Sequence, residues 1–132
     1  MREIKFRGKQ TKPIESIWLH GDLMHSRDNK TYIQKITCME VDENTVGQYT
    51  GLKDKNGVEI YEGDIVHIPE NWEEYGWASG ENYEIDFKEG RFRMKPKYKP
   101  NAVGYDLENT NELEVIGNIY ENPELLEVEN EK

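Results

Sequence analysis

Four carboxylates gather in the centre of the sequence, where paired acids could act as general acid and base or hold a divalent metal ion. They are Asp54, Glu59, Glu62 and Asp64. Asp54 and Asp64 lie in predicted turns close to glycine, where a short carboxylate hydrogen-bonds to the local backbone. Glu59 and Glu62 flank a predicted strand as solvated charges. The sequence therefore favours a structural role for all four.

Three other polar residues, His20, Asp22 and His25, surround one predicted turn. With His67 or Cys38 they could form a tetrahedral metal site. The sequence has one cysteine and neither an HExxH nor a CxxC motif, so this spacing is not diagnostic of a metal site. We expect surface or turn histidines, no metal and no cofactor.

Candidate nucleophiles also lack a supporting context. Ser16, Ser26 and Ser79 do not lie in a nucleophile-elbow motif, and Cys38 has no neighbouring base in the sequence. Cys38 lies in an apolar run that reads as a buried β position. We therefore expect no catalytic residue.

A basic stripe is the sharpest local feature of the chain. In an extended strand its side chains would share one face about 6.6 Å apart, with Phe92, Met94 and Tyr98 on the other face. Such a stripe could bind an anion or a partner. Alternatively, its charges could protect an edge strand from pairing with other chains, and Pro96 and Pro100 would fit that purpose. The stripe consists of Arg91, Arg93, Lys95, Lys97 and Lys99.

A second candidate for partner binding is an aromatic segment, residues 71–81. It contains Trp72, Tyr75 and Trp77 without a usable period, so we predict a long loop. Its aromatic side chains either fold back onto the core or contact a partner. Trp72 and Trp77 are the residues that we expect to bind.

The elements that must position these residues are mostly strands. Short runs of period two, bounded by Gly, Asn, Asp and Pro, predict a mainly β protein with antiparallel sheets and little helix. The first strand carries Ile4 and Phe6. A hairpin is predicted over residues 17–24, with its turn at His20-Gly21-Asp22. Another strand is predicted over residues 31–37, which are rich in β-branched side chains.

The central block, residues 45–68, has the clearest turn chemistry. Asn56-Gly57 is a strong hairpin signal because both residues tolerate a positive φ. We predict a strand over residues 58–61, a tight turn over residues 62–64 and a buried strand over residues 65–68. This order is reminiscent of small SH3-like barrels, which is a weak analogy.

The C-terminal part predicts another hairpin and a short helix. Residues 83–87 alternate in polarity, Glu89-Gly90 forms a turn, and residues 91–95 form the return strand. A last strand is predicted over residues 113–120. Asn122-Pro123-Glu124 has the N-cap, proline and acidic residue that begin a helix.

Length and composition indicate one domain. The chain has 132 residues, of which 35% are hydrophobic and 33% charged, and its aromatic residues allow one core. We expect a single β-rich domain over residues 1–128 and a frayed acidic tail over residues 129–132. The net charge of -10 would repel nucleic acid and anionic membranes.

The expected compartment is the cytoplasm. A single cysteine cannot form an internal disulfide, which is typical of a reducing compartment. The N-terminus has no continuous apolar stretch of the kind found in signal peptides, and no segment approaches the roughly 20 apolar residues of a membrane span.

Five stretches of the sequence together form a recognisable pattern. They are Ile4–Arg7, Trp18–Leu23, Val46–Gly57, Glu59–Val66 and Glu114–Leu126. With these stretches the chain resembles the YopX family, small proteins encoded by phages and prophages of low-GC Gram-positive bacteria. The resemblance covers nearly the whole chain except residues 71–107. It implies a β-rich fold with a barrel-like portion and a phage accessory role, but no activity and no catalytic residue.

The sequence favours a phage accessory module without enzymatic activity, which binds a host or phage macromolecule alone or as a homo-oligomer joined through β edges. The alternative is a small metal-dependent hydrolase or nuclease-like enzyme that uses Asp64, Glu62 and a histidine. A third hypothesis, binding of single-stranded nucleic acid through Tyr98 or Trp72, is the weakest because of the net charge.

Overall fold

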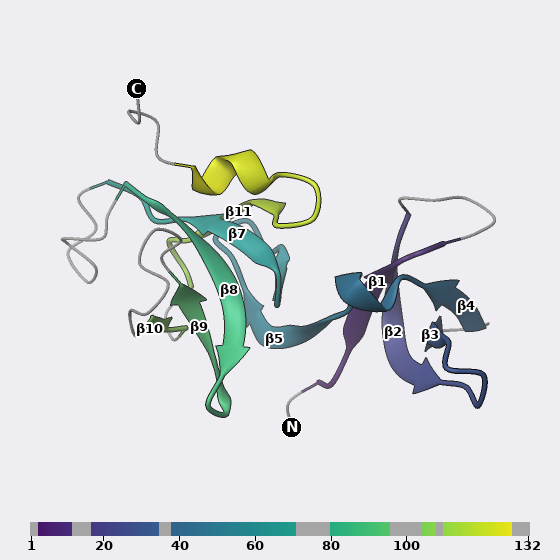
Figure 1. Cartoon of the computed structure of the whole chain (residues 1–132). Coiled ribbons are helices and arrows are strands. Elements are labelled where there is room, and N and C mark those ends of the chain that lie inside the picture. Colours follow the sequence, from purple (N-terminus) through teal and green to yellow (C-terminus); the bar gives the residue numbers. More distant parts are fainter. Residues whose placement is uncertain are drawn as a thin grey trace. The chain divides into compact units, whose positions relative to one another are not determined.

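The computed structural model describes residues 3–11, 17–34, 38–70, 80–95, 104–107 and 110–127, and it is mainly β (Figure 1). The chain divides into two compact units, Met1–Gly51 (unit 1) and Leu52–Lys132 (unit 2), which are described in turn. The single domain over residues 1–128 stays a prediction. In the described part of the chain, no helix is long and apolar enough to cross a membrane.

One antiparallel sheet contains the described strands of unit 1. Its strand order is β4-β3-β2-β1-β5-β6, and β5 continues past Gly51 into unit 2, to which β6 belongs. The elements of unit 1 are β1 (Phe6–Lys9), β2 (Trp18–His25), β3 (Thr31–Gln34), β4 (Cys38–Val41), the 3-10 helix η1 (Glu43–Thr45) and β5 (Gly47–Lys53).

The predicted hairpin over residues 17–24 is wrong, because these residues belong to one long strand, β2. The first half of β2 pairs with β1, and the second half pairs with β3. Gly21 lies where the partner changes. A Cβ atom there would come within 2.3 Å of the backbone oxygen of Gln34. This glycine therefore permits a close approach of two strands rather than a turn.

The sheet of unit 1 curls so that residues just after β1 meet β4. Gln10 forms a bridge with Val41, and the backbone N–H of Asp42 donates to the carbonyl oxygen of Lys9 at 2.9 Å. A Cβ atom on Gly8 would lie 2.9 Å from the side chain of Val41. The buried hydrophobic side chains among the described residues of unit 1 are Ile33, Val41 and Tyr49.

Two other predictions for unit 1 need smaller adjustments. The first strand begins at Phe6, and Ile4 precedes it with 65% of its surface exposed. The strand predicted over residues 31–37 is present as β3, Thr31–Gln34, and residues 35–37 lie outside the described residues.

A second antiparallel sheet forms most of unit 2, with the strand order β10-β9-β8-β7-β11. The predicted turn at residues 62–64, the buried strand after it and the hairpin over residues 83–95 are confirmed. Apart from β6 (Glu59–Tyr61), which belongs to the first sheet, the strands are β7 (Asp64–His67), β8 (Asn82–Lys88), β9 (Arg91–Lys95), β10 (Tyr105–Asp106) and β11 (Glu114–Asn118).

The core of unit 2 is built from side chains of β6 to β9 and of residues next to β7 and β11. Tyr83 of β8 belongs to this core, and its ring meets that of Tyr105 edge to face with the ring centres 5.6 Å apart. Aromatic pairs prefer this geometry. The core side chains with no exposed surface are Ile60, Val66, Ile68, Ile85, Met94 and Leu113.

The prediction of a short C-terminal helix needs correction, since the structure has a single 3-10 turn, η3 (Pro123–Leu126). The side chain of Asn122 makes no capping hydrogen bond. Its Oδ1 instead accepts from the backbone N–H of Asn118 at 3.2 Å. The side chain predicted to cap the helix therefore binds the last residue of β11.

An SH3-like barrel is not confirmed. Among the described strands the five-stranded sheet is open, with β10 at one edge and β11 at the other. The coarser prediction of a mainly β protein with antiparallel sheets is confirmed.

Candidate functional site

Asp54, the first of the four central carboxylates, is committed to the backbone. It is 6% exposed, and its Oδ1 accepts from the N–H groups of Asn56 at 2.8 Å and Val58 at 2.9 Å. Its Oδ2 accepts from the N–H of Val115 at 2.9 Å. Both oxygens are thus occupied by backbone donors, which confirms the structural role predicted for this residue.

Asp64 has an equivalent role in the next turn. It is 2% exposed, and its Oδ2 accepts from the backbone N–H of Tyr61 at 2.7 Å. Gly63, inside this turn, has a φ of +94°. The hydroxyl of Tyr61 donates to Glu59 Oε1 at 2.9 Å. Asp64 and Glu59 thus hold the backbone and the side chain of Tyr61 in place.

The histidines also make local contacts. His25 Nδ1 lies 3.2 Å from the hydroxyl of Thr31. His67 Nδ1 lies 2.7 Å from Asn82 Oδ1, and Asn82 Nδ2 donates to the carbonyl oxygen of Leu125 at 2.8 Å, which ties η3 to the sheet. Within the described residues, no group of three His, Cys, Asp or Glu side chains could hold a metal ion.

The first three members of the basic stripe lie on β9, opposite charged residues of β8. Directly opposed residues of an antiparallel pair share one face of the sheet. Lys95 faces Glu84, Arg93 faces Asp86, and Arg91 faces Lys88. Two of the three cations therefore face a carboxylate, which the sequence analysis did not anticipate.

Arg93 is buried and bound to Asp86. It is 5% exposed, its Nε donates to Asp86 Oδ1 at 2.8 Å, and its Nη2 donates to Asp86 Oδ2 at 3.1 Å. A Cβ atom on Gly104 would lie 3.1 Å from Arg93 Cδ, so the chain before β10 packs against this side chain. A guanidinium held by both carboxylate oxygens is a specific, rigid arrangement. Arg93 thus acts within the fold.

The interpretation of residues 91–95 as a protected edge strand is wrong. β10 pairs along β9, with Tyr105 opposite Met94 and Asp106 opposite Arg93. Arg91 also forms an ion pair with Asp106. The binding role of the stripe stays a prediction. Lys97 and Lys99, together with Trp72 and Trp77, lie outside the described residues.

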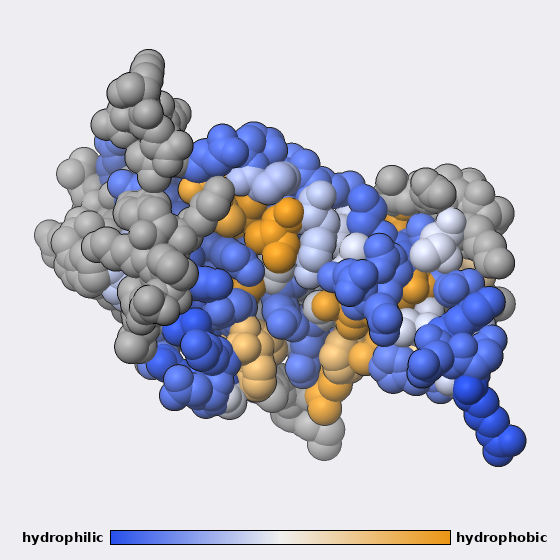
Figure 2. Space-filling model, viewed as in Figure 1, coloured by the Kyte–Doolittle hydropathy of each residue, from blue (hydrophilic) through white to orange (hydrophobic). Residues whose placement is uncertain are grey.

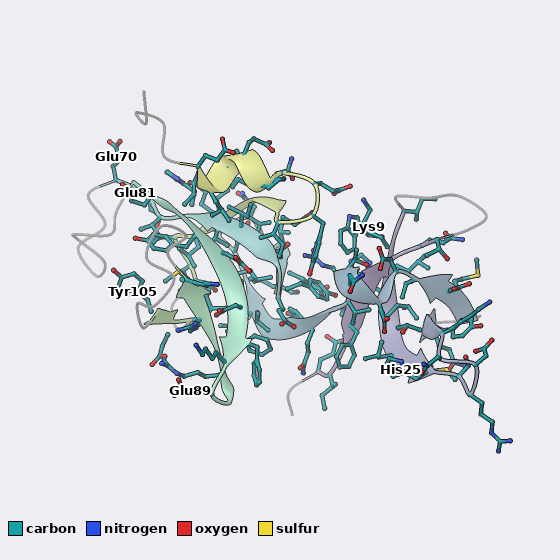
Figure 3. The ribbon with its side chains drawn as sticks, viewed as in Figure 1. Lys9, His25, Glu70, Glu81, Glu89 and Tyr105 are labelled. Atoms are coloured by element: carbon teal, nitrogen blue, oxygen red, sulfur yellow. The ribbon has the colours of Figure 1, made fainter. Side chains whose placement is uncertain are left out.

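Sequence reasoning missed an aromatic pair at the hairpin tip, residues 87–92, in which Phe87 is exposed and Phe92 is half-buried. Phe87 and Phe92 are opposed across β8 and β9, and their rings meet edge to face with the centres 4.9 Å apart. Phe87 is 48% exposed. Figure 3 labels Glu89 in the turn that ends this hairpin. The alternation of β8 placed Phe87 on the core face, but the hairpin extends beyond the core.

The two faces of the hairpin tip differ in chemistry. One face carries the aromatic pair, and the other carries Lys88 opposite Arg91. Figure 2 shows hydrophobic residues on the visible face in separate patches between hydrophilic ones. The exposed large hydrophobic side chains of the described residues are Ile4, Ile17, Met24, Val58 and Phe87.

The charged face of the β8–β9 hairpin perturbs one carboxyl group. Burial raises the pKa of Glu84 above its ordinary value, and the nearby Asp86 and Glu62 raise this pKa further. Lys95 acts in the opposite direction. Such a carboxyl is held in a less favourable environment for its charge than water provides.

Unit 1 contains another basic pattern that the sequence analysis missed. Lys5, which precedes β1, and Arg7 and Lys9 of β1 alternate in the sequence and lie over aromatic rings. The guanidinium of Arg7 is 4.6 Å from the ring centre of Trp18, and Lys5 Nζ is 5.2 Å from that of Tyr49. Arg7 and Tyr49 are buried, so these cation–π contacts belong to the packing of the protein.

Comparisons with known proteins agree with the resemblance seen in the sequence. The model of a family described as YopX protein matches residues 5–127, which confirms that resemblance. The chain is similar to protein EF1440 from Enterococcus faecalis, known from its crystal structure. The two are 27% identical with a TM-score of 0.56, and the match covers 96% of this chain and 100% of that one. No curated protein matches.

Proposed function

We propose that this chain, which belongs to the YopX protein family, is a phage accessory module that binds a protein partner and catalyses no reaction. The use of Asp54 and Asp64 by backbone N–H groups supports the second half of this proposal. A phage or prophage origin, the host cytoplasm as the place of action and a barrel-like portion are parts of the proposal that come from the family resemblance and the composition.

The observation that carries the proposal is the partly exposed aromatic pair at the hairpin tip. Phe87 is 48% exposed although it packs on Phe92, and aromatic side chains are enriched where proteins bind one another. The neighbouring Lys88 is exposed, and Arg91 is held by Asp106. The tip thus offers an apolar face around Phe87, with Lys88 on the opposite face.

Charge favours a protein over a nucleic acid as the partner. Residues 52–132 contain 9 Lys and Arg against 20 Asp and Glu, a balance of -11, whereas residues 1–51 contain 8 against 7, a balance of +1. The tip belongs to the acidic unit 2. A phosphate backbone would be repelled by this unit, because nucleic-acid affinity comes largely from neutralising phosphates.

Affinity capture from lysates of infected and uninfected host cells tests the proposal. The wild-type chain is compared with a double variant, F87S and F92S, and with K88E. A control variant, K30E, reverses an exposed charge in the turn between β2 and β3. We expect a captured protein that both tip variants lose and that K30E retains, with circular dichroism showing that all variants fold.

Retention of the same partners by both tip variants would contradict a role for the tip. If the chain captured only further copies of itself and eluted as a larger species in size-exclusion chromatography, that result would show a homo-oligomer instead of a complex with a foreign protein. Capture of nucleic acid that high salt then releases from the chain would contradict the proposal of a protein partner.

The metal-dependent hydrolase stays an untested alternative. Its predicted residues Asp64 and Glu62 lie in one turn, but Asp64 is already bound to the backbone of Tyr61. A bound metal would raise the melting temperature with its concentration. A rise with magnesium, manganese or zinc that the D64N variant abolishes would favour this alternative over the binding module.

A further inference from the structure

Asn56-Gly57 is the one Asn-Gly step in the sequence, and it lies at the exposed end of the β5–β6 hairpin. We propose that Asn56 is a site of spontaneous deamidation and that the native turn holds this reaction back. Asparagine followed by glycine is chemically labile because the next residue has no side chain to hinder attack by its nitrogen.

The turn exposes the reacting residues to solvent but restrains the nitrogen that must attack. Both Asn56 and Gly57 are exposed, and a Cβ atom at Gly57 would meet nothing within 4 Å. However, the N–H of Gly57 donates to the carbonyl oxygen of Asp54 at 3.0 Å. Asp54 Oδ1 also accepts from the N–H groups of Asn56 and Val58. The attacking nitrogen is therefore part of a hydrogen-bonded loop.

The reaction needs only water and a base from the solvent. The nitrogen of Gly57 loses its proton to the base and attacks Cγ of Asn56, and Nδ2 takes up a proton from the solvent and leaves as ammonia when its bond to Cγ breaks. Water then opens the resulting succinimide at either carbonyl, which gives aspartate or isoaspartate at position 56. Because the hydrogen bond to Asp54 holds the proton that must leave, the turn has to open before the attack.

The product would weaken the turn that restrained it. Isoaspartate adds a methylene group to the backbone between the N–H groups of residues 56 and 58, both of which Asp54 binds. Either product adds a negative charge beside a carboxylate that is 6% exposed. Asp54 also holds Val115 of β11, so the damage would extend beyond the hairpin.

Peptide mapping of the full-length chain after incubation in mildly alkaline buffer tests the proposal. One sample is native and the other is unfolded in guanidinium chloride. We expect conversion at Asn56 in both, at least about tenfold slower in the native sample, since opening the turn breaks several hydrogen bonds. The D54N variant, kept below its melting temperature, should convert faster than the wild type.

Asn29 provides an internal control. It lies in a turn with the same pattern of backbone hydrogen bonds, at the position that Gly57 has in the other turn, because the N–H of Asn29 donates to Ser26 and that of Ser26 to Lys30. The residue after it is lysine, so Asn29 should remain unconverted while Asn56 reacts. Absence of conversion at Asn56 in guanidinium chloride would overturn the proposal. Equal rates in the native and unfolded samples would overturn the protection by the turn.

Discussion

The carboxylate of Asp54 accepts a hydrogen bond from the backbone N–H of Val115, which lies 61 residues further along the chain. The same carboxylate closes the β5–β6 turn through Asn56 and Val58. One buried side chain therefore joins a local turn to the edge strand β11.

The D54N variant should be strongly destabilised. It replaces one acceptor oxygen by a donor and removes a charge, which leaves backbone N–H groups without a good acceptor. Hydrogen bonds to charged groups contribute about 1.5–3 kcal/mol each, so we expect a loss of roughly 2 kcal/mol or more. Unfolding of the variant in guanidinium chloride should show this loss as a lower midpoint concentration than that of the wild type.

The exposed Asp22 on β2 is the control for this prediction. D22N removes the same charge from the surface and should leave the midpoint almost unchanged. If D54N also unfolded at the wild-type midpoint, the hydrogen bonds of Asp54 would contribute nothing net to stability.

Two neighbouring cations of the basic stripe should differ in their contribution to stability. Arg93 is buried and its partner Asp86 is 20% exposed, whereas the side chains of Arg91 and Asp106 are 39% and 51% exposed. Removing one partner of a buried pair costs about 3–5 kcal/mol, and an exposed pair contributes about 0–1 kcal/mol. R93M should therefore destabilise the protein far more than R91M.

A double-mutant cycle separates the ion pair from packing. The variants R93M, D86N and their combination are compared by guanidinium unfolding, and we expect a coupling free energy above about 1 kcal/mol between positions 86 and 93. A coupling near zero would mean that Arg93 stabilises the protein through its aliphatic stem alone.

Glu84 should make stability depend on pH. Burial, with help from Asp86 and Glu62, raises its pKa above the ordinary value of 4.5. A carboxyl group whose pKa is raised on folding contributes stability below its unfolded pKa and loses it as the pH rises through the folded pKa. At neutral pH the ionised group is therefore unfavourable, and E84Q should be more stable than the wild type.

The advantage of E84Q should shrink as the pH falls toward the ordinary value of 4.5 and below, where the carboxyl is protonated in both states. Unfolding free energies measured across this range give the test. The E81Q variant, at an exposed position before β8, controls for the loss of one negative charge. A constant difference between E84Q and wild type at every pH would contradict the role assigned to Glu84.

Local signals in the sequence predicted the hairpins at Asn56-Gly57 and Glu89-Gly90, because turn chemistry depends on the residues in the turn itself. Gly21 was misread as a turn residue because its role depends on a distant part of the chain. It accommodates the backbone of Gln34, which comes close only when β2 pairs with β3. The partners of the basic stripe were missed because Asp86 and Asp106 meet Arg93 and Arg91 only once the register is known.

The alternation of polar and apolar residues in β8 correctly placed Ile85 and Phe87 on one face of the strand. It did not predict that the core ends between them, with Ile85 buried and Phe87 exposed. The same limit applies to Asn122, whose cap-like sequence was read locally while its oxygen binds Asn118. Elements were thus predictable where local chemistry determines them, and the surroundings of the candidate site were not.

The turns also predict which substitutions relieve backbone strain. Glu89 has a φ of +56°, a conformation that costs an L-residue energy, whereas Gly57 adopts +81° without that cost. E89G should therefore stabilise the protein by up to about 1 kcal/mol, and G57A should destabilise it by about 1 kcal/mol. A Cβ atom at Gly57 would touch nothing, so G57A isolates the backbone effect from crowding. Thermal unfolding measures both, and a loss of stability in E89G would show that the Glu89 side chain contributes more than its backbone conformation costs.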